Sequence, residues 1–483
     1  MTTEPGYGVA IIGAGVVGTA IARQLSHCDL RIILIEASDD VGTGTSKANT
    51  AIRHTGFDAE PGTVESALLR RGFPLLSEYA AAAGIPLQVT GALLVAWDAE
   101  QLAALDRLAE RSKANGYTAV HPVTVDDLYR REPHLGPGAV GALGIPDEGI
   151  ICPFTTPLAF ATEAVLNGAE LRLSSPVTSV RALAGTHWLR VPGGDVTAQW
   201  VINAAGLHSD TLDRMFGHDR FTIKPRRGEL IVFDKVAAGL VNSVLLPVPT
   251  PISKGVLIAP TVFGNVLLGP TAEDVEDRRA TQSTASGVAA LLTKGSRIVP
   301  GLCEEEVTSV YAGLRAATGH ADYQITCYPD QRYVCVGGIR STGLSASMGI
   351  AAYVTDLLAD AGLKQPPAAR HRQARMPPIG EVSLRPYRDE DAIRRNPAFG
   401  QVVCHCERVT RGEVLAAAAA AVPARTIDGL RRRTRAMLGR CQGFYCLAHI
   451  TAILAEATGI PAAKLLNLDG ARALDMALDR GKP

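Results

Sequence analysis

The chain has no excess of charge of either sign. Its 483 residues include 48 Lys and Arg against 48 Asp and Glu, so the formal net charge is zero. Proteins built to coat nucleic acid or an anionic membrane are strongly basic, so neither is expected as a partner. Hydrophobic residues make up 47% and charged residues 20%, a globular rather than disordered balance. A chain of this length is expected to form two or three domains.

Membrane-spanning and secretory segments are also missing from the sequence. No apolar run reaches the roughly 18 residues that a spanning helix needs. The first residues, MTTEPGYGVAIIGAG, have no basic region before the apolar stretch and do not predict a signal peptide. The expected location is the cytoplasm, with peripheral attachment to the inner face of the membrane through a partner as the alternative.

A glycine motif follows the first apolar segment. Residues 9–12 predict a strand, Gly13, Gly15 and Gly18 follow in the pattern G-x-G-x-x-G, and a helical stretch leads to a second strand ending at Glu36. In such a unit the glycines allow a tight turn, the approach of a pyrophosphate and close helix–strand packing. The carboxylate of Glu36 is placed where it can accept hydrogen bonds from ribose hydroxyls. The motif predicts a dinucleotide site without distinguishing FAD from NAD, and no second complete fingerprint is present.

Three further segments resemble the D-amino-acid-oxidase-type FAD-dependent oxidoreductases: TSKANT at 45–50, NAAG at 203–206 and GGIRSTGL at 337–344. The nearest branch holds the anaerobic glycerol-3-phosphate dehydrogenase large subunit and the L-2-hydroxyglutarate dehydrogenases. The resemblance implies FAD, an α/β fold with a Rossmann-like FAD-binding domain, and an inserted α+β substrate domain. The FAD contacts that it implies, beyond the first glycine motif and Glu36, are Thr45, Ser46, Asn49, Ala205, Gly206, Gly338, Arg340, Gly343 and Leu344.

The same resemblance suggests domain boundaries. FAD-binding pieces are expected at about 1–85, 150–215 and 330–362, with the substrate domain at about 86–149 and 216–329. Residues 363–400 are rich in Pro and Arg and lack an apolar period, which predicts a linker or a wrapping segment. Residues 401–483 are expected to form a small helical domain, with helices at 411–422, 427–438 and 447–457. Thr410 and Glu413 have the spacing of a capping box at the start of the first.

Oxidation of an alcohol needs a base for the hydroxyl proton and an anchor for an anionic substrate. By resemblance, Arg315 corresponds to the arginine that grips the substrate's phosphate or carboxylate. His54 and His320 are the candidate bases, because imidazole titrates near neutral pH, and His54 lies in the segment expected to run past the flavin. Arg340 is a candidate for positive charge beside the flavin. A structural hydrogen bond for each histidine and a surface ion pair for Arg340 are the alternatives.

Four of the nine cysteines form two tight pairs near the C-terminus. Cys404 and Cys406 are separated by one residue, and Cys441 and Cys446 by four. The pattern resembles the 2Fe–2S domain of bacterioferritin-associated ferredoxin, which is also appended to the anaerobic glycerol-3-phosphate dehydrogenase large subunit. Four thiolates match a 2Fe–2S cluster. A structural zinc ion and unliganded thiols are the alternatives.

Together these features predict a two-cofactor dehydrogenase. FAD would oxidise a small anionic hydroxy substrate, with glycerol 3-phosphate or a similar polyol phosphate favoured. L-2-hydroxyglutarate or another 2-hydroxy acid, and an amine or opine, are the alternatives. Electrons would pass through the 2Fe–2S centre to a quinone, an electron-transfer protein or a partner subunit. A non-enzymatic alternative makes the cysteine domain a docking, iron-handling or zinc module.

Overall fold

The computed structural model describes residues 6–183, 185–249 and 255–466, which divide into two units, Met1–Met376 and Pro377–Pro483. Within the described residues, no helix is both long enough and apolar enough to cross a membrane.

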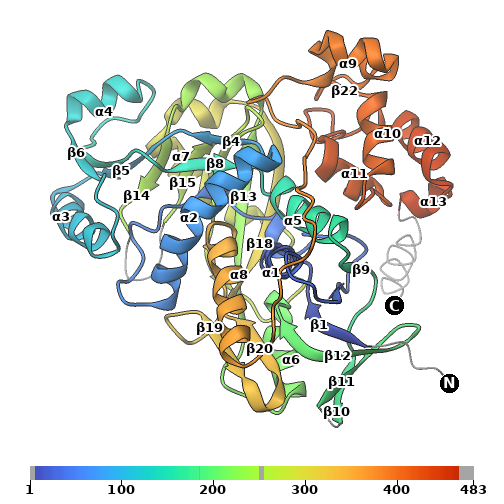
Figure 1. The fold of residues 1–483 in the computed structure, drawn as a ribbon. Coiled ribbons are helices and arrows are strands. Elements are labelled where there is room, and N and C mark those ends of the chain that lie inside the picture. Colours follow the sequence, from blue (N-terminus) through green and yellow to red (C-terminus); the bar gives the residue numbers. More distant parts are fainter. Residues whose placement is uncertain (1–5, 184, 250–254, 467–483) are drawn as a thin grey trace, which may run out of the picture. The chain divides into compact units, whose positions relative to one another are not determined.

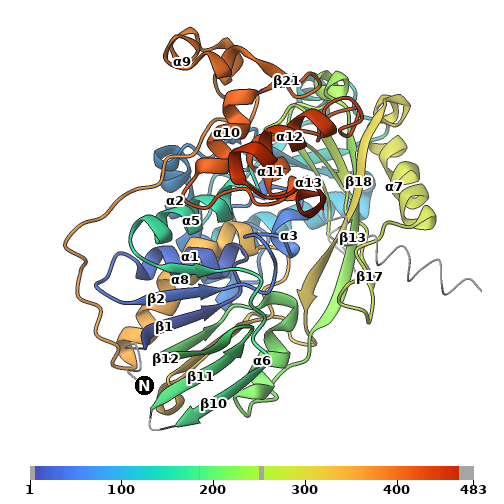
Figure 2. The same cartoon turned by 90° about the vertical axis from the view of Figure 1, so that its right-hand side faces the viewer.

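The first unit contains an eight-stranded sheet in which β2, β1, β12 and β20 run parallel. Helices α1, α5 and α8 lie against one face of it (Figure 2). The bounds are β1 Tyr7–Ile12, β2 Ile32–Ile35, β9 Glu170–Arg172, β10 Ser179–Leu183, β11 Thr186–Val191, β12 Gly194–Asn203, β19 Gln324–Tyr328, β20 Tyr333–Gly337, α1 Val16–Leu25, α5 Thr155–Leu166, α6 Ser209–Met215 and α8 Gly343–Asp360.

Helix α2, Val64–Ala83, runs alongside α8 (Figure 1). Two glycines allow the close approach. A Cβ at Gly349 would lie 2.1 Å from the carbonyl oxygen of Leu68, and one at Gly72 would lie 2.9 Å from that of Ser345. Since real Cβ atoms do not come this close to backbone atoms, larger residues would push the two helices apart. The packing fixes the N-terminus of α8, where the flavin is expected.

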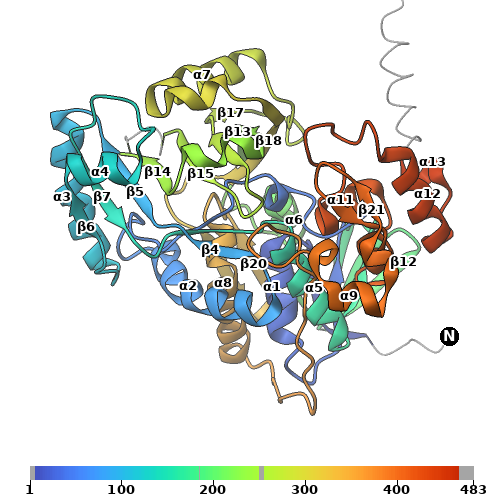
Figure 3. The same ribbon diagram turned by 90° about the horizontal axis from the view of Figure 1, so that it is seen from above.

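This unit also contains a nine-stranded sheet, and the face covered by α7 holds the core that includes Ile231, Phe233 and Leu268. Helix α7 packs against β13 and β16, while α3 and α4 pack beside β7 (Figure 3). The bounds are β5 Ala92–Ala96, β6 His121–Val123, β7 Gly141–Ile145, β13 Lys224–Phe233, β14 Val244–Pro247, β15 Leu257–Pro260, β16 Val266–Gly269, β17 Glu273–Asp274, β18 Val307–Ala317, α3 Ala99–Ala114, α4 Val125–Arg131 and α7 Ala285–Ile298.

A short three-stranded sheet carries the segment that contains His54. Strand β8, Gly149–Ile151, pairs antiparallel with β3, Ile52–Arg53, on one side and with β4, Leu87–Val89, on the other. This pairing brings the residues that follow Arg53 close to the residues that precede Gly149, although the two segments are far apart in the sequence.

The second unit is helical with one two-stranded sheet. Its bounds are β21 Val402–Cys404, β22 Val409–Thr410, α9 Glu390–Arg395, α10 Arg411–Ala419, α11 Ile427–Thr434, α12 Leu447–Thr458 and α13 Ala462–Leu465. The capping box is confirmed, because the Thr410 hydroxyl accepts from the Glu413 N–H and the Glu413 carboxylate accepts from the Thr410 N–H. Helix α11 ends four residues earlier than expected, because Arg435 adopts a left-handed conformation with φ 68°.

The structure places the unit boundary inside the expected linker. Residues up to Met376 stay with the first unit, where the Met376 N–H donates to the Ala83 carbonyl. Residues from Pro377 onward belong to the second unit and include α9, which the composition did not predict. Asp389 caps this helix by accepting from the Ala392 N–H. Arg385 is buried and pairs with the buried Glu413 at 3.2 Å, so this part is a structural component of the second unit.

Candidate active site

The glycines of the turn after β1 are needed for two different reasons. Two of them allow the protein to pack, and one leaves room for a ligand. A Cβ at Gly13 would lie 2.5 Å from the Ala204 carbonyl oxygen, and one at Gly18 would lie 1.9 Å from that of Gly13. Both positions must therefore be glycine for the protein to pack. A Cβ at Gly15 would meet only the Ser46 hydroxyl, at 3.3 Å. The protein leaves room at Gly15, as expected where a pyrophosphate approaches the backbone.

Glu36 lies beside this turn. Its carboxylate accepts hydrogen bonds from the N–H groups of Ala14, at 2.6 Å, and Ser38, at 2.8 Å. The Ser46 hydroxyl accepts from the Val16 N–H at 2.9 Å in the first turn of α1. These contacts hold an acid and a hydroxyl at the start of α1, a region suited to the ribose and phosphates of a dinucleotide.

The segment containing Thr45 and Asn49 is fixed against β18. The Thr45 hydroxyl donates to the Leu314 carbonyl at 2.7 Å, and the Tyr311 hydroxyl donates to the Asn49 carbonyl at 2.9 Å. A Cβ at Gly313 would lie 2.2 Å from the Ala48 carbonyl oxygen, so glycine is needed for this approach. Strand β18 therefore joins the nucleotide-binding segment to the nine-stranded sheet.

Two further predicted FAD segments lie at ends of the eight-stranded sheet. Ala205 and Gly206 follow β12, and the Ala205 Cα is 3.0 Å from the Cβ position of Gly13. Gly338 follows β20 with φ +64°, and Gly343 and Leu344 open α8, which has no side-chain N-cap. Backbone N–H groups at this helix start suit the flavin edge where negative charge develops on reduction. The residues present therefore fit FAD.

His54 lies between two carboxylates. Its Nδ1 is 2.7 Å from Glu148 Oε1 and its Nε2 is 2.9 Å from Asp58 Oδ1. Burial acts to lower the pKa of His54, but the charges and hydrogen bonds of Glu148 and Asp58 outweigh it and raise the pKa to about 10. The His54 N–H donates to the Ser345 hydroxyl in the first turn of α8. His54 therefore lies beside the expected flavin site, held as a cation.

Arg315 lies on β18 and has no acidic partner among the residues that the structure describes. Among the described residues it makes one hydrogen bond, to the Thr271 carbonyl at 3.4 Å, and no ion pair. The opposite residue in the ladder, Arg226, instead pairs with Asp274 through two hydrogen bonds. Burial and the nearby charge of Arg226 lower the pKa of Arg315 to about 10. It still carries a charge at neutral pH, and that charge is available to an anion.

The other two catalytic candidates are placed differently. His320 is exposed, and its Nε2 lies 3.2 Å from the Arg220 carbonyl oxygen. Arg340 forms an ion pair with Glu65 at 2.8 Å and also donates to the Ala321 carbonyl. The Arg340 guanidinium thus links the loop before α8 to the start of α2. It forms an ion pair, which was the alternative to a role beside the flavin.

Glu148 and Asp58 were missed by the sequence reasoning. Asp58 follows His54 by four residues, a spacing visible in the sequence. Glu148 is 94 residues away in the PDEG turn, and nothing in the sequence connects it with His54.

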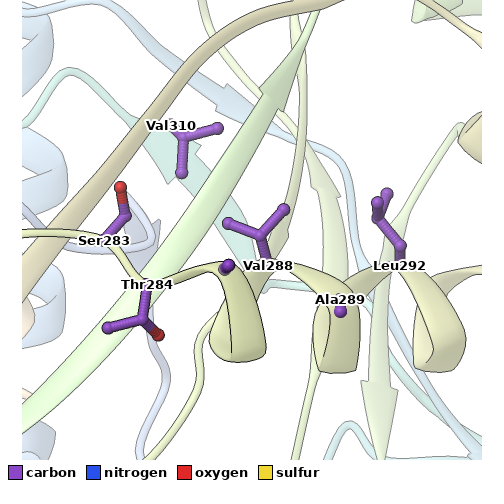
Figure 4. Close-up of a pocket in the computed structure, with 7 residues that line it drawn as sticks. Ser283, Thr284, Val288, Ala289, Leu292 and Val310 are labelled. Atoms are coloured by element: carbon purple, nitrogen blue, oxygen red, sulfur yellow. The ribbon is translucent and has the colours of Figure 1, made fainter.

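An open apolar depression of about 420 Å³ lies elsewhere, between α7 and β18 (Figure 4). It includes none of the predicted site residues. It is lined by Ser283, Thr284, Ala285, Val288, Ala289, Leu292 and Val310.

The four clustered cysteines converge in the second unit. The Cys446 thiol interacts with the thiols of Cys404, Cys441 and Cys406, and the Cys406 thiol interacts with those of Cys441 and Cys404. Cys404 and Cys446 are buried, whereas Cys406 is exposed. The N–H groups of Tyr445, Gly443 and Phe444 hydrogen-bond to Cys441 and lower the pKa of its thiol. Such donors favour the thiolate that a cluster requires.

Among the described residues, the cysteine sulfurs do not lie at the spacing of a tetrahedral zinc site. Around a tetrahedral zinc ion with Zn–S bonds of about 2.3 Å, all sulfurs lie about 3.8 Å apart. Yet within the described ranges the group with three ligand atoms mutually within 4.8 Å is His27, Glu163 and His371, not a set of cysteines. Four thiolates are the donor set that a 2Fe–2S cluster takes, and these four cysteines would supply it.

Comparisons with known proteins cover nearly the whole chain. Residues 8–357 match the FAD dependent oxidoreductase (DAO) family model, and residues 402–456 match the BFD-like 2Fe-2S binding domain. A glycerol 3-phosphate dehydrogenase of Caloramator mitchellensis is 34% identical over 94% of this chain and 95% of its own length. An L-2-hydroxyglutarate dehydrogenase of Indibacter alkaliphilus is more distant, 28% identical over 55% of this chain and 68% of its own.

A solved structure shares the fold of the first unit. The FAD-bound L-alpha-glycerophosphate oxidase of Mycoplasma pneumoniae superposes with a TM-score of 0.73 at 28% identity, covering 78% of this chain and 100% of that one. With the glycine turn, Glu36 and the α8 terminus arranged for a dinucleotide, these matches show that the chain belongs to the FAD dependent oxidoreductase (DAO) family and carries a C-terminal BFD-like 2Fe–2S domain.

Proposed function

We propose that this protein oxidises glycerol 3-phosphate, or a closely similar polyol phosphate, and passes the electrons through its 2Fe–2S domain to an acceptor. The observation that carries the substrate assignment is the partly buried guanidinium of Arg315, which has no acidic partner among the described residues. A buried cation without a counter-ion is costly unless an anion joins it. The relatives named for glycerol 3-phosphate support phosphate as that anion.

The side chains have complementary roles. FAD, when bound, supplies the two-electron acceptor. Arg315 binds the phosphate through its planar fork, which orients the alcohol. His54 receives the hydroxyl proton at Nε2 once the proton already on that nitrogen has left. Glu36 and the α1 start hold the nucleotide, and the α8 terminus stabilises charge at the flavin edge.

The assignment is tested by anaerobic flavin bleaching. Glycerol 3-phosphate should bleach the flavin of the purified holoenzyme, whereas L-2-hydroxyglutarate and an amine such as proline should not. Arg315→Gln should raise KM for glycerol 3-phosphate by about 100-fold, since a charge-assisted contact is removed. Bleaching by the hydroxy acid alone would overturn the assignment.

We propose further that the four cysteines hold the cluster and relay electrons outward, Cys404 with Cys446 inside and Cys406 with Cys441 at the surface. Cys406→Ser should lower the iron content from about two per chain and abolish transfer to the physiological acceptor, while substrate still bleaches the flavin. Cys303→Ser, a half-buried cysteine of the first unit, is the control. Zinc in place of iron would refute the relay.

The acceptor is proposed to be a quinone, an electron-transfer protein or a partner subunit. Peripheral attachment to the inner face of the membrane through such a partner is part of the same proposal. It predicts that the enzyme co-sediments with membranes only when its acceptor is present in them.

A further inference from the structure

The strand register brings Glu148 to His54. Strands β3 and β8 run antiparallel with Arg53 opposite Gly149, so His54 and Glu148 occupy the next position along the ladder. A Cβ at Gly149 would lie 2.5 Å from the Gln88 carbonyl oxygen on β4. Glycine is therefore required directly after Glu148, which fixes the acid at this strand end.

The hydrogen bonds of Glu148 determine which ring nitrogen of His54 carries a proton. Glu148 is fully buried. Its Oε1 accepts from the Thr55 N–H and from the Thr55 hydroxyl, each at 2.8 Å, and lies 2.7 Å from His54 Nδ1. A backbone N–H can only donate, so Oε1 acts as an acceptor, and Nδ1 must donate its proton to it. The second oxygen, Oε2, is buried and has no partner among the described residues.

Resting on the proposed function, we propose that Glu148 is the positioning residue for His54: it holds the Nδ1 proton and so leaves Nε2 as the nitrogen that exchanges a proton with the substrate hydroxyl. A carboxylate on the far side of a catalytic imidazole fixes both its tautomer and its orientation. Glu148 itself does not touch the substrate.

The proton path follows from the two ring contacts. In the structure both nitrogens face carboxylates, so the ring is held as a cation. Before catalysis the Nε2 proton passes to Asp58 or to water, while Nδ1 keeps its proton on Glu148. The substrate O–H bond then breaks as an N–H bond forms at Nε2. Asp58 must leave Nε2 to admit the hydroxyl.

The charges around the ring set the direction of the pH effect. Asp58 lies on the same segment, and Glu148 and Asp147 lie in the turn before β8. Arg53 donates to the Asp147 carbonyl and to Ser77 of α2, and α8 contributes the uncharged Ser345 hydroxyl. Removing the Glu148 charge takes away one of the two groups that raise the pKa of His54, so that pKa must fall.

The test compares Glu148→Gln with wild-type holoenzyme. The amide can still accept from Nδ1 and Thr55, but the charge is gone. We expect the acidic limb of the pH profile of kcat/KM for glycerol 3-phosphate to move at least about one pH unit lower. The plateau value of kcat should fall by about 100-fold, the lower end of the range for general-base effects. KM should change less than about threefold, because Arg315 still binds the phosphate.

Two controls separate positioning from folding. Glu132→Gln changes another fully buried carboxylate, which accepts from the N–H groups of Asn242 and Ser243. Thr55→Val removes one donor to Glu148 but keeps the charge. Neither variant should shift the acidic limb of the pH profile of kcat/KM. The inference would be overturned if the acidic limb of the kcat/KM profile moved equally in Thr55→Val. It would also be overturned if this limb stayed at the wild-type pH in Glu148→Gln.

A second readout does not depend on turnover. In the holoenzyme labelled with 15N-histidine, and assigned with His54→Gln, the neutral His54 ring should carry its proton on Nδ1, and its titration midpoint should fall in Glu148→Gln. An Nε2–H tautomer would refute the role of Glu148. If the tautomer is as expected but glycerol 3-phosphate fails to bleach the flavin, the substrate assignment fails and the positioning role stands.

Discussion

The guanidinium of Arg315 lies directly over Gly228 on the neighbouring strand. A Cβ at Gly228 would come within 2.8 Å of Arg315 Nη2 and 3.0 Å of Pro270. Glycine at this position therefore leaves room for the Arg315 side chain, which we propose binds the substrate anion, on the surface of the sheet.

This contact predicts that Gly228→Ala displaces Arg315 without removing it. KM for glycerol 3-phosphate should rise by about 10-fold, with kcat reduced less, because one well-placed charged contact is weakened. Steady-state kinetics with a dye acceptor would measure it. Gly239→Ala is the matched control, since no heavy atom lies within 4 Å of its Cβ position. Unchanged KM in Gly228→Ala would show that Arg315 does not bind the substrate from this position.

The glycine turn predicts different outcomes for its members. Gly15→Ala should leave the fold intact and weaken FAD binding by about 10-fold or more, because the methyl group enters the space left for the pyrophosphate. Gly18→Ala should instead impair folding, since its Cβ would lie 1.9 Å from a carbonyl oxygen. Flavin fluorescence titration of the apoprotein gives the affinity, with Gly8→Ala as control. Equal FAD affinity in Gly15→Ala would contradict the assignment.

The buried Glu163 predicts acid sensitivity of the first unit. Its carboxylate lies 2.8 Å from Arg23 and 3.1 and 3.2 Å from His27 and His371, and it accepts from the Ala374 N–H. Burial acts to raise the pKa of Glu163, but these partners outweigh it and lower the pKa to about 2. A depressed carboxyl pKa stabilises the fold above the ordinary value, near 4.5, and this contribution is lost as pH falls toward 2.

Glu163→Gln should therefore cost about 3 kcal/mol at neutral pH, because the Arg23 charge stays behind in a buried site. Between pH 4.5 and 2, the stability difference between wild type and variant should shrink. Denaturant unfolding at several pH values would measure both. A constant difference across this range would mean that Glu163 does not titrate as the contacts imply. Glu132→Gln again provides a buried-carboxylate comparison.

The unit boundary predicts which fragments fold. A fragment ending after Met376 should keep the melting temperature and FAD content of the first unit. One ending at residue 362 should lose stability, because the Ala374 and Met376 hydrogen bonds disappear. A C-terminal fragment starting at Pro377 should fold, whereas one starting at residue 401 lacks Arg385 and leaves Glu413 buried without its ion pair. Equal stability within each pair would refute the boundary.

The sequence predicted local structure correctly where residues close together in the chain determine it. The Thr410–Glu413 capping box and the strand–turn–helix at Gly13 depend on backbone groups within a few residues. The short helices of segment 377–400 were not predicted, because they have no apolar period. They are held by caps such as Asp389 and by the buried Arg385, neither of which composition reveals. Helix α11 stops early because Arg435 turns left-handed and pairs with Glu407.

The sequence alone determined the family, the dinucleotide motif and the four cysteines, because each depends on residue types at short, fixed spacings. Only the tertiary structure determined which charged side chains pair with one another. Glu148 reaches His54 through the register of β3 and β8, and Arg340 is bound to Glu65. In the described part of the chain, Arg226 pairs with Asp274 while Arg315 has no acidic partner. Charge pairing depends on distances of a few ångströms between residues tens or hundreds of positions apart, and only strand pairing and helix packing fix those distances.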